Sequence, residues 1–180
     1  DTYTIANGLE IPKLGLGTWF IDDADAPAAV LAAVEIGYRH IDTAQAYGNE
    51  RGVGEGIRTS GIDRDDLFVT TKLAADIKSH DEAVVAIDGS LATLGLDRID
   101  LMIIHSPQPW EDFGGEDRYF DGNRQAWRAL EEAYEAGKLG AIGVSNFQQA
   151  DIDNLLGACT VAPMVNQVLA HITNTPTELI

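Results

Sequence analysis

The sequence predicts a parallel α/β fold, and two observations support that prediction. Short apolar runs alternate with amphipathic segments along the chain, one run every ~20–40 residues, which is the pattern of parallel βα units. Each run also ends in a polar residue, as 101–104 does before His105. Such a run is typical of a strand buried on both faces. We therefore expect a (β/α)8 TIM barrel, of which residues 1–180 supply about the first six strands as one partial domain.

An open, doubly wound parallel sheet is the structural alternative. Its expected fingerprint is a G-x-G-x-x-G segment that opens the first helix, and the sequence has none there. The barrel is therefore the preferred architecture.

The N-terminal part of the chain predicts a hairpin, a strand and a helix. Asn7-Gly8 lies between two short alternating segments within 2–13 and favours a β-hairpin, because both residues accept positive φ. Residues 14–19 follow as a short, glycine-containing buried strand. Residues 22–37 have an apolar stripe, a proline suited to the first turn and a glycine suited to the C-terminal cap, so they predict a helix.

The rest of the chain continues the alternation. Five further strands are expected at 38–41, 67–71, 101–104, 141–144 and 164–166. Helices are expected at 50–60, behind a capping box at 79–82, around 127–137, around 152–156, and from Asn174 to the last residue, Ile180. Residues 106–122 are too long and too rich in turn residues for a plain connection, so we expect a functional loop there.

Composition excludes several classes of partner. The 180 residues contain 12 basic and 29 acidic side chains, a net charge of −17 that argues against nucleic acid or an anionic membrane as partner. Cys159 is the only cysteine, which indicates a reducing compartment, and no apolar run approaches the ~20 residues of a membrane span. We expect a cytoplasmic protein.

The residues that end the strands suggest a chemistry. Asp42, Lys72 and His105 would meet at the carboxyl edge of the sheet, with Tyr47 in the loop after Asp42. An ammonium ~4 Å from a phenol favours the phenolate by roughly 4 kcal/mol at an effective dielectric of 20, so we expect the lysine to lower the tyrosine pKa. The set suits protonation of an oxygen as a carbonyl is reduced. It offers no evident nucleophile, and a metal site at His40 and Asp42 would lack further ligands.

The same residues resemble the motifs of a known family. The segment 42–50, DTAQAYGNE, is similar to the Asp-x-x-x-x-Tyr-x-Asn-Glu motif of the aldo-keto reductases. Thr71-Lys72, Ile104-His105, the segment GVSNF at 143–147 and the Asn-Gln pair at 166–167 resemble the family's other motifs, in the same order. The likeness runs from about Gly8 to Ile180 and is greatest to bacterial reductases of small aldehydes and ketones, such as the diketogluconate reductases.

This resemblance implies an activity and a role for each residue. The activity is NADPH-dependent reduction of a small carbonyl compound, with no metal, by a protein that is monomeric if complete. Tyr47 would be the general acid, Asp42 and Lys72 would tune it, and His105 would orient the substrate. Gly17 and Thr18 would approach the cofactor, Ser145, Asn146 and Gln167 would bind its carboxamide, and Trp19 and Trp110 would line the substrate pocket.

The sequence also departs from the family. Ser106 stands where many members have tryptophan, which would open that wall of the pocket, and 168–172 differs from the usual exit of the sixth strand. Strands seven and eight and the basic segment that grips the adenosine phosphate are not in these 180 residues.

Other interpretations therefore stay open. Asp42 and Lys72 could form a purely structural ion pair, Ser145 and Asn146 could cap a helix, and the two tryptophans could be packing residues. The chain as a whole could be a non-catalytic barrel fragment or interaction module, prone to self-association through an exposed sheet edge. A metal-dependent barrel hydrolase is the third alternative.

Overall fold

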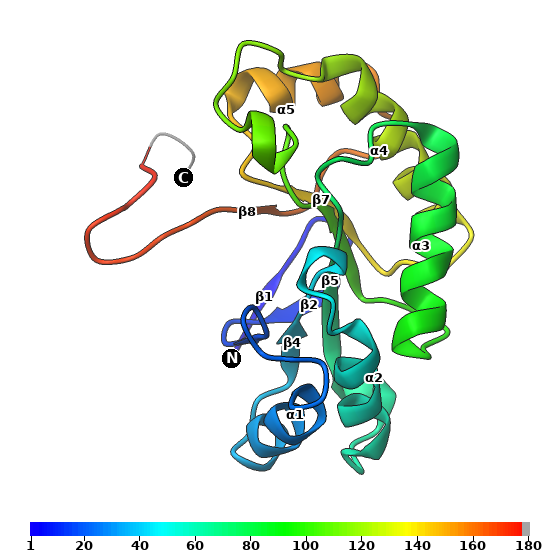
Figure 1. Cartoon of the computed structure of the whole chain (residues 1–180), viewed down its shortest axis with the longest axis vertical. Coiled ribbons are helices and arrows are strands. Elements are labelled where there is room, and N and C mark those ends of the chain that lie inside the picture. Colours follow the sequence, from blue (N-terminus) through cyan, green and yellow to red (C-terminus); the bar gives the residue numbers. More distant parts are fainter. Residues whose placement is uncertain (178–180) are drawn as a thin grey trace.

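A six-stranded parallel sheet forms the centre of the computed structural model, which describes residues 1–177. Its strands are β3 (Leu16–Gly17), β4 (His40–Asp42), β5 (Phe68–Leu73), β6 (Leu101–Ile104), β7 (Ile142–Ser145) and β8 (Asn166–Gln167). Each strand pairs with the next one along the chain, and all five pairings are parallel. The sheet curls into a half-barrel with its helices on the outside (Figure 1).

Five helices alternate with the strands. They are α1 (Ala26–Glu35), α2 (Glu50–Thr59), α3 (His80–Leu94), α4 (Phe120–Glu135) and α5 (Gln149–Leu156). Ser79 is the N-cap of α3, as predicted, and its hydroxyl accepts a hydrogen bond from the Glu82 backbone N–H. Single 3₁₀ turns form η1 (Gln45–Tyr47), η2 (Arg64–Asp66) and η3 (Trp110–Asp112). Within residues 1–177, no helix combines the length and the apolar character needed to cross a membrane.

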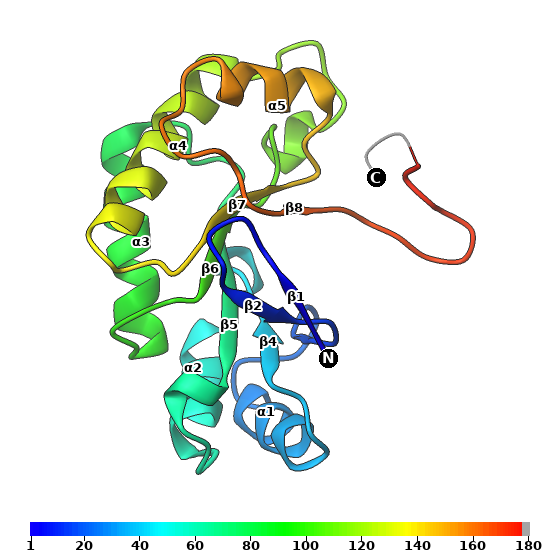
Figure 2. The same ribbon diagram turned by 180° about the vertical axis from the view of Figure 1, so that it is seen from behind.

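The core lies on both faces of the sheet. On β6, Met102 and Ile104 face the layer of helices, where they pack with residues such as Trp127. Leu101 and Ile103 face the concave side, where they pack against the N-terminal hairpin. That hairpin, β1 (Thr2–Thr4) and β2 (Glu10–Pro12), lies across the inner face of the half-barrel (Figure 2). The near-continuous apolar character of the strands follows from this burial on two sides.

Glycine allows α2 to lie very close to its neighbours. A Cβ on Gly54 would lie 2.0 Å from the backbone oxygen of Leu94, at the end of α3. The glycine repeat at 52–56 therefore serves helix packing, because α2 contacts α1 and α3 at backbone distance.

Two predicted elements differ in the structure. Only Leu16–Gly17 of the expected strand at 14–19 pairs with β4, and Leu14 is 74% exposed, because the described residues provide β3 with a partner on one side only. The expected C-terminal helix is wrong over 174–177. The backbone groups of Asn174 pair with those of His171 across a tight turn, its side-chain amide donates to the carbonyl of Leu169, and residues 174–177 form no helix. The remainder of that predicted helix, 178–180, lies outside the described residues.

Candidate active site

Lys72 is the centre of the candidate site. It lies on β5 with its side chain 2% exposed, and its ammonium donates hydrogen bonds to Asp42 Oδ1, to the Thr43 carbonyl at 2.9 Å and to Tyr47 Oη at 3.3 Å. Asp42 ends the neighbouring strand β4, so the carboxylate reaches the ammonium from the adjacent strand. The parallel strand ends thus bring together three of the four predicted residues, and a buried ammonium is both neutralised and hydrogen-bonded.

Tyr47 is held in place by its own short helix. It ends η1, which begins at Gln45 and is closed by Gly48 at a φ of 68°. The Gln45 side chain accepts a hydrogen bond from the Ala74 N–H at 2.8 Å, and it donates to the Ser90 hydroxyl at 2.9 Å. The turn that carries the phenol is therefore fixed to the end of β5 and to α3.

His105 completes the predicted set. Its backbone N–H bonds the Leu73 carbonyl at 3.0 Å, so it continues the β5–β6 ladder by one residue. Its ring lies edge-on to Tyr47, with centroids 5.6 Å apart, and edge-on to Trp110 at 5.2 Å. Nδ1 is buried and has no hydrogen-bond partner among residues 1–177. Because Nδ1 is buried, a ligand in the cavity would meet His105 through another part of its ring.

The electrostatics differ from the expectation in one respect. Burial raises the pKa of Tyr47 to about 12, and the negative charge of Asp42 adds to this rise. The expected lowering of the Tyr47 pKa is therefore wrong for the protein alone. Burial and the Asp42 charge together outweigh the effect of the ammonium on the phenol, and the pKa of Lys72 is itself lowered by burial. Burial also lowers the pKa of His105 to about 4, helped by the charge of Lys72, so the imidazole is neutral at pH 7.

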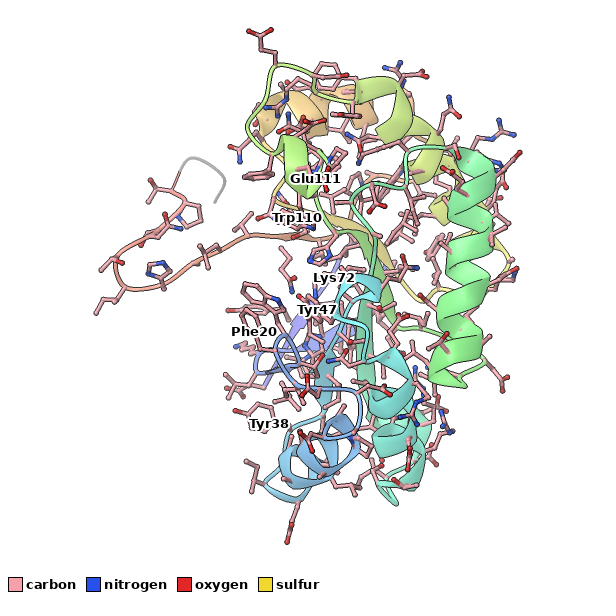
Figure 3. The ribbon with its side chains drawn as sticks, in the orientation of Figure 1. Phe20, Tyr38, Tyr47, Lys72, Trp110 and Glu111 are labelled. Atoms are coloured by element: carbon pink, nitrogen blue, oxygen red, sulfur yellow. The ribbon has the colours of Figure 1, made fainter. Side chains whose placement is uncertain are left out.

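These side chains open onto one cavity of about 620 Å³. Its walls come from most of the predicted site residues, and they are Tyr47, Lys72, His105, Trp19, Trp110, Ser145, Asn146 and Gln167, with Ala46, Val168 and Leu169. Tyr47 and Lys72 lie close together in Figure 3, with Phe20 to one side of them and Trp110 to the other. Except for Asp42, the predicted catalytic, carboxamide-binding and pocket residues therefore share one space.

Of the predicted cofactor residues, Ser145, Asn146 and Gln167 line this cavity, whereas Gly17 and Thr18 do not. Asn146 follows β7 at a φ of 61°, and its amide donates to the His105 carbonyl at 3.2 Å and to Ser145 Oγ at 3.0 Å. Gln167 ends β8 and donates to Asp42 Oδ2 at 2.8 Å. Gly17 lies on the wall of an adjacent pocket of about 400 Å³, which it shares with Asp42 and Gln167. Thr18 lines neither pocket, because it is fully buried and its hydroxyl bonds the Asp42 carbonyl at 3.1 Å.

Two of the alternative interpretations can be compared with this geometry. Ser145 and Asn146 do not cap α5, because its N-cap is Gln148, whose backbone N–H donates to Asp151 Oδ2 at 2.9 Å. His40 turns its Nε2 to the Thr70 hydroxyl at 2.8 Å, away from any ligand cluster with Asp42. No group of three potential metal ligands occurs among residues 1–177.

Sequence reasoning missed several residues around the cavity. Phe20 stacks on Trp19 with centroids 4.3 Å apart and has a positive φ of 64°, and Phe113 lies 5.6 Å from Trp110. Their aromatic side chains, close in sequence to the predicted pocket residues Trp19 and Trp110, could have identified them from the sequence. The positive φ of Phe20 could not have been predicted in this way. Ser106 is completely buried and does not line the cavity; the surface beside His105 is covered by Trp110 instead.

Solved structures resemble this fold closely. An aldo/keto reductase from Brucella melitensis superposes with a TM-score of 0.92 and 41% sequence identity, covering 99% of this chain and 65% of that one. A Bombyx mori aldo-keto reductase in complex with NADP has a TM-score of 0.82 and 37% identity, covering 94% of this chain and 58% of its own. These structures are TIM barrels, so the curled sheet is part of the predicted barrel and the predicted fold class is confirmed.

The sequence comparisons agree. The chain is 43% identical over 180 residues to glyoxal reductase of Bacillus subtilis, and 44% identical over 169 residues to 9,11-endoperoxide prostaglandin H2 reductase of Trypanosoma cruzi. These alignments cover 99% and 93% of this chain, but only 61% and 56% of the length of those two relatives. The model of the Aldo/keto reductase family matches residues 13–180, and the chain therefore belongs to that family.

Proposed function

We propose that the protein of which this chain is a part reduces aldehydes and ketones to alcohols with NADPH, using Tyr47 as the general acid. The observation that supports this most strongly is the 3.3 Å contact between Lys72 Nζ and Tyr47 Oη at the wall of a 620 Å³ cavity. The name of one relative, glyoxal reductase, supports the reaction class, since glyoxal is a small dialdehyde.

Each side chain has a task in this reaction. The neutral imidazole of His105 would donate an N–H to the carbonyl oxygen of the substrate and orient it. Tyr47 would then give its phenolic proton to that oxygen as negative charge develops there, which is favourable because an alkoxide is a far stronger base than a phenolate. Lys72 would stabilise the resulting phenolate, and Asp42 would keep the ammonium charged and in place.

The residues fit the nicotinamide end of the cofactor. Asn146 and Gln167 supply amide donors and acceptors, and Ser145 a hydroxyl, at adjacent strand ends on the cavity wall, which suits a carboxamide. The cofactor, when bound, supplies the hydride. Lys72 is the only cation that the cavity presents within residues 1–177, so the cofactor phosphates require groups outside this cavity.

The test is turnover of a Tyr47→Phe variant of the full-length protein. Phenylalanine keeps the ring against His105 and removes only the proton donor. We expect the rate of NADPH-dependent aldehyde reduction to fall by about 10²–10⁴-fold, the usual contribution of a general acid. Unchanged NADPH binding, measured by fluorescence, would show that the cofactor site is intact. Near-full activity would reject Tyr47 as the general acid.

Cytoplasmic location and a monomeric state remain predictions from the sequence. Size-exclusion chromatography with light scattering on the full-length protein would check the second of these.

A further inference from the structure

The loop between β6 and α4 is folded around one buried side chain. Gln108 is 2% exposed, although it lies in a loop. Its Nε2 donates to the carbonyl oxygens of Gly115 at 3.0 Å and Asp117 at 2.5 Å, and its Oε1 accepts the N–H of Gly114 at 3.0 Å. One amide therefore satisfies three backbone groups, and Gly114 reaches its bond at a φ of 85°. The loop is a compact structure with a polar centre, comparable to an Ω-loop.

Side chains from two other elements fasten this loop at its ends. At the start, Lys78 donates to the Ser106 carbonyl at 3.2 Å and to Asn123 Oδ1 at 2.7 Å. At the far end, Arg118 forms an ion pair with Asp151, which is fully buried at the start of α5. The base of the loop is thus fixed, and the segment between these attachments is shaped from within by Gln108.

That segment carries a wall of the cavity. Trp110 lines the cavity and meets the ring of His105 edge-on at 5.2 Å, and the ring of Phe113 lies 5.6 Å from the indole. Trp110 is 48% exposed, and no side-chain hydrogen bond holds its indole among residues 1–177. Phe113, whose ring lies beside Trp110, directly precedes Gly114, whose N–H is bound by Gln108. The position of Trp110 therefore depends on the backbone that Gln108 organises.

We infer that Gln108 is a positioning residue that sets substrate selectivity, by holding Trp110 as an aromatic wall beside His105. This inference rests on the proposed reductase function and deepens it. The substrates that it concerns are carbonyl compounds with an aromatic or bulky apolar substituent, which would stack on the indole. The reduction of a carbonyl compound too small to reach the indole would not be affected by a displacement of Trp110.

The test compares Gln108→Glu with a matched control in the full-length protein. Glutamate has the same shape and still accepts from Gly114, but it has no donor for the two carbonyl oxygens and directs an anionic oxygen at them. Gln125→Glu, the same substitution at an exposed position of α4, is the control. The substrates are methylglyoxal and 4-nitrobenzaldehyde. A third measurement, the ¹⁹F NMR spectrum of 5-fluorotryptophan-labelled protein, reports on the indoles without turnover.

We expect Gln108→Glu to reduce kcat/KM for 4-nitrobenzaldehyde by about tenfold, mainly through KM, the value of one aromatic contact. For methylglyoxal kcat/KM should stay within about twofold. The Trp110 resonance, assigned with Trp110→Phe, should move while those of Trp19 and Trp127 stay. In a Trp110→Ala background, Gln108→Glu should have no further effect on the ratio of the two kcat/KM values.

Equal losses on both substrates, an unmoved Trp110 resonance, or a full additional loss in the Trp110→Ala background would each overturn the inference. If the unmodified protein reduces neither carbonyl, the proposed function is wrong. The NMR comparison would then still decide whether Gln108 positions Trp110.

Discussion

Replacing Lys72 by methionine removes the ammonium and keeps most of the side-chain volume. Three groups lose a partner in Lys72→Met, namely the Asp42 carboxylate, the Thr43 carbonyl and the Tyr47 hydroxyl. If the lysine stabilises the phenolate that forms when Tyr47 gives up its proton, the chemical step must slow.

The size of the effect follows from the 3.3 Å separation of Nζ and Oη. At an effective dielectric of 20, a full charge pair at that distance is worth about 5 kcal/mol. If about half of the phenolate charge is present in the transition state, the loss is about 2.5 kcal/mol, or roughly 70-fold in kcat. With the full charge present the loss would be a few thousand-fold, so we expect a fall in kcat between these limits.

The assay is steady-state oxidation of NADPH by the full-length protein with a small aldehyde. Lys138→Met is the control, because Lys138 forms an exposed ion pair with Asp88 far from the cavity lining. A folded Lys72→Met variant whose kcat stays within about threefold of the parent would refute the electrostatic role of the lysine.

Loss of folding must be separated from loss of chemistry. Lys72→Met leaves Asp42 as a largely buried carboxylate without its cation, which we expect to cost about 3 kcal/mol. Adding Asp42→Asn removes that unpaired charge, so the double variant should have a higher Tm than the single variant and still turn over slowly. If the double variant regained turnover, slow chemistry in the single variant would be a folding defect.

Three further predictions concern pH, helix packing and the loop attachment. Reduction should have a flat kcat/KM between about pH 6 and 9, since Tyr47, with a pKa of about 12, stays protonated and His105, with a pKa of about 4, stays neutral. Alcohol oxidation, which needs the phenolate, should rise with pH over the same range, and a break in the reduction profile near pH 7 would contradict this. Gly54→Ala should destabilise by about 3 kcal/mol because its Cβ meets backbone at 2.0 Å, whereas Gly89→Ala, in open space on α3, should be neutral or stabilise by up to about 1 kcal/mol in urea denaturation. Asp151→Ala should lower the free energy of unfolding by about 2 kcal/mol, because it removes the helix cap and the ion pair, and an unchanged urea midpoint would show that these contacts contribute nothing.

The alternation of strands and helices was predictable because burial on two faces leaves a strong pattern in the sequence. β6 illustrates this, since all of its residues are buried and the next residue, His105, lies at the rim. The same regularity located most of the candidate site, because parallel strands place the residues that follow them at one edge.

The remaining features depend on interactions that no sequence pattern records. The direction of the Tyr47 pKa depends on how far burial and Asp42 outweigh an ammonium that is already paired. The turn at 171–174 gives the backbone and side chain of Asn174 local hydrogen-bond partners, and these compete with its use as a helix N-cap. Gln108 could not be recognised, because its role consists of hydrogen bonds to a backbone whose path it helps to create.

The order of the sheet has a consequence for synthesis on the ribosome. Each strand from β4 to β8 pairs with the strand made just before it, so within this sheet no gap between two strands has to be kept open for one made later. The candidate residues would then arrive as successive additions to an existing edge, Asp42 first, Lys72 beside it and His105 after that. At each stage of synthesis the sheet ends in an edge strand, and the strand that will pair with it is the next one to leave the ribosome. The candidate residue at the end of that edge strand is then the one that solvent still reaches.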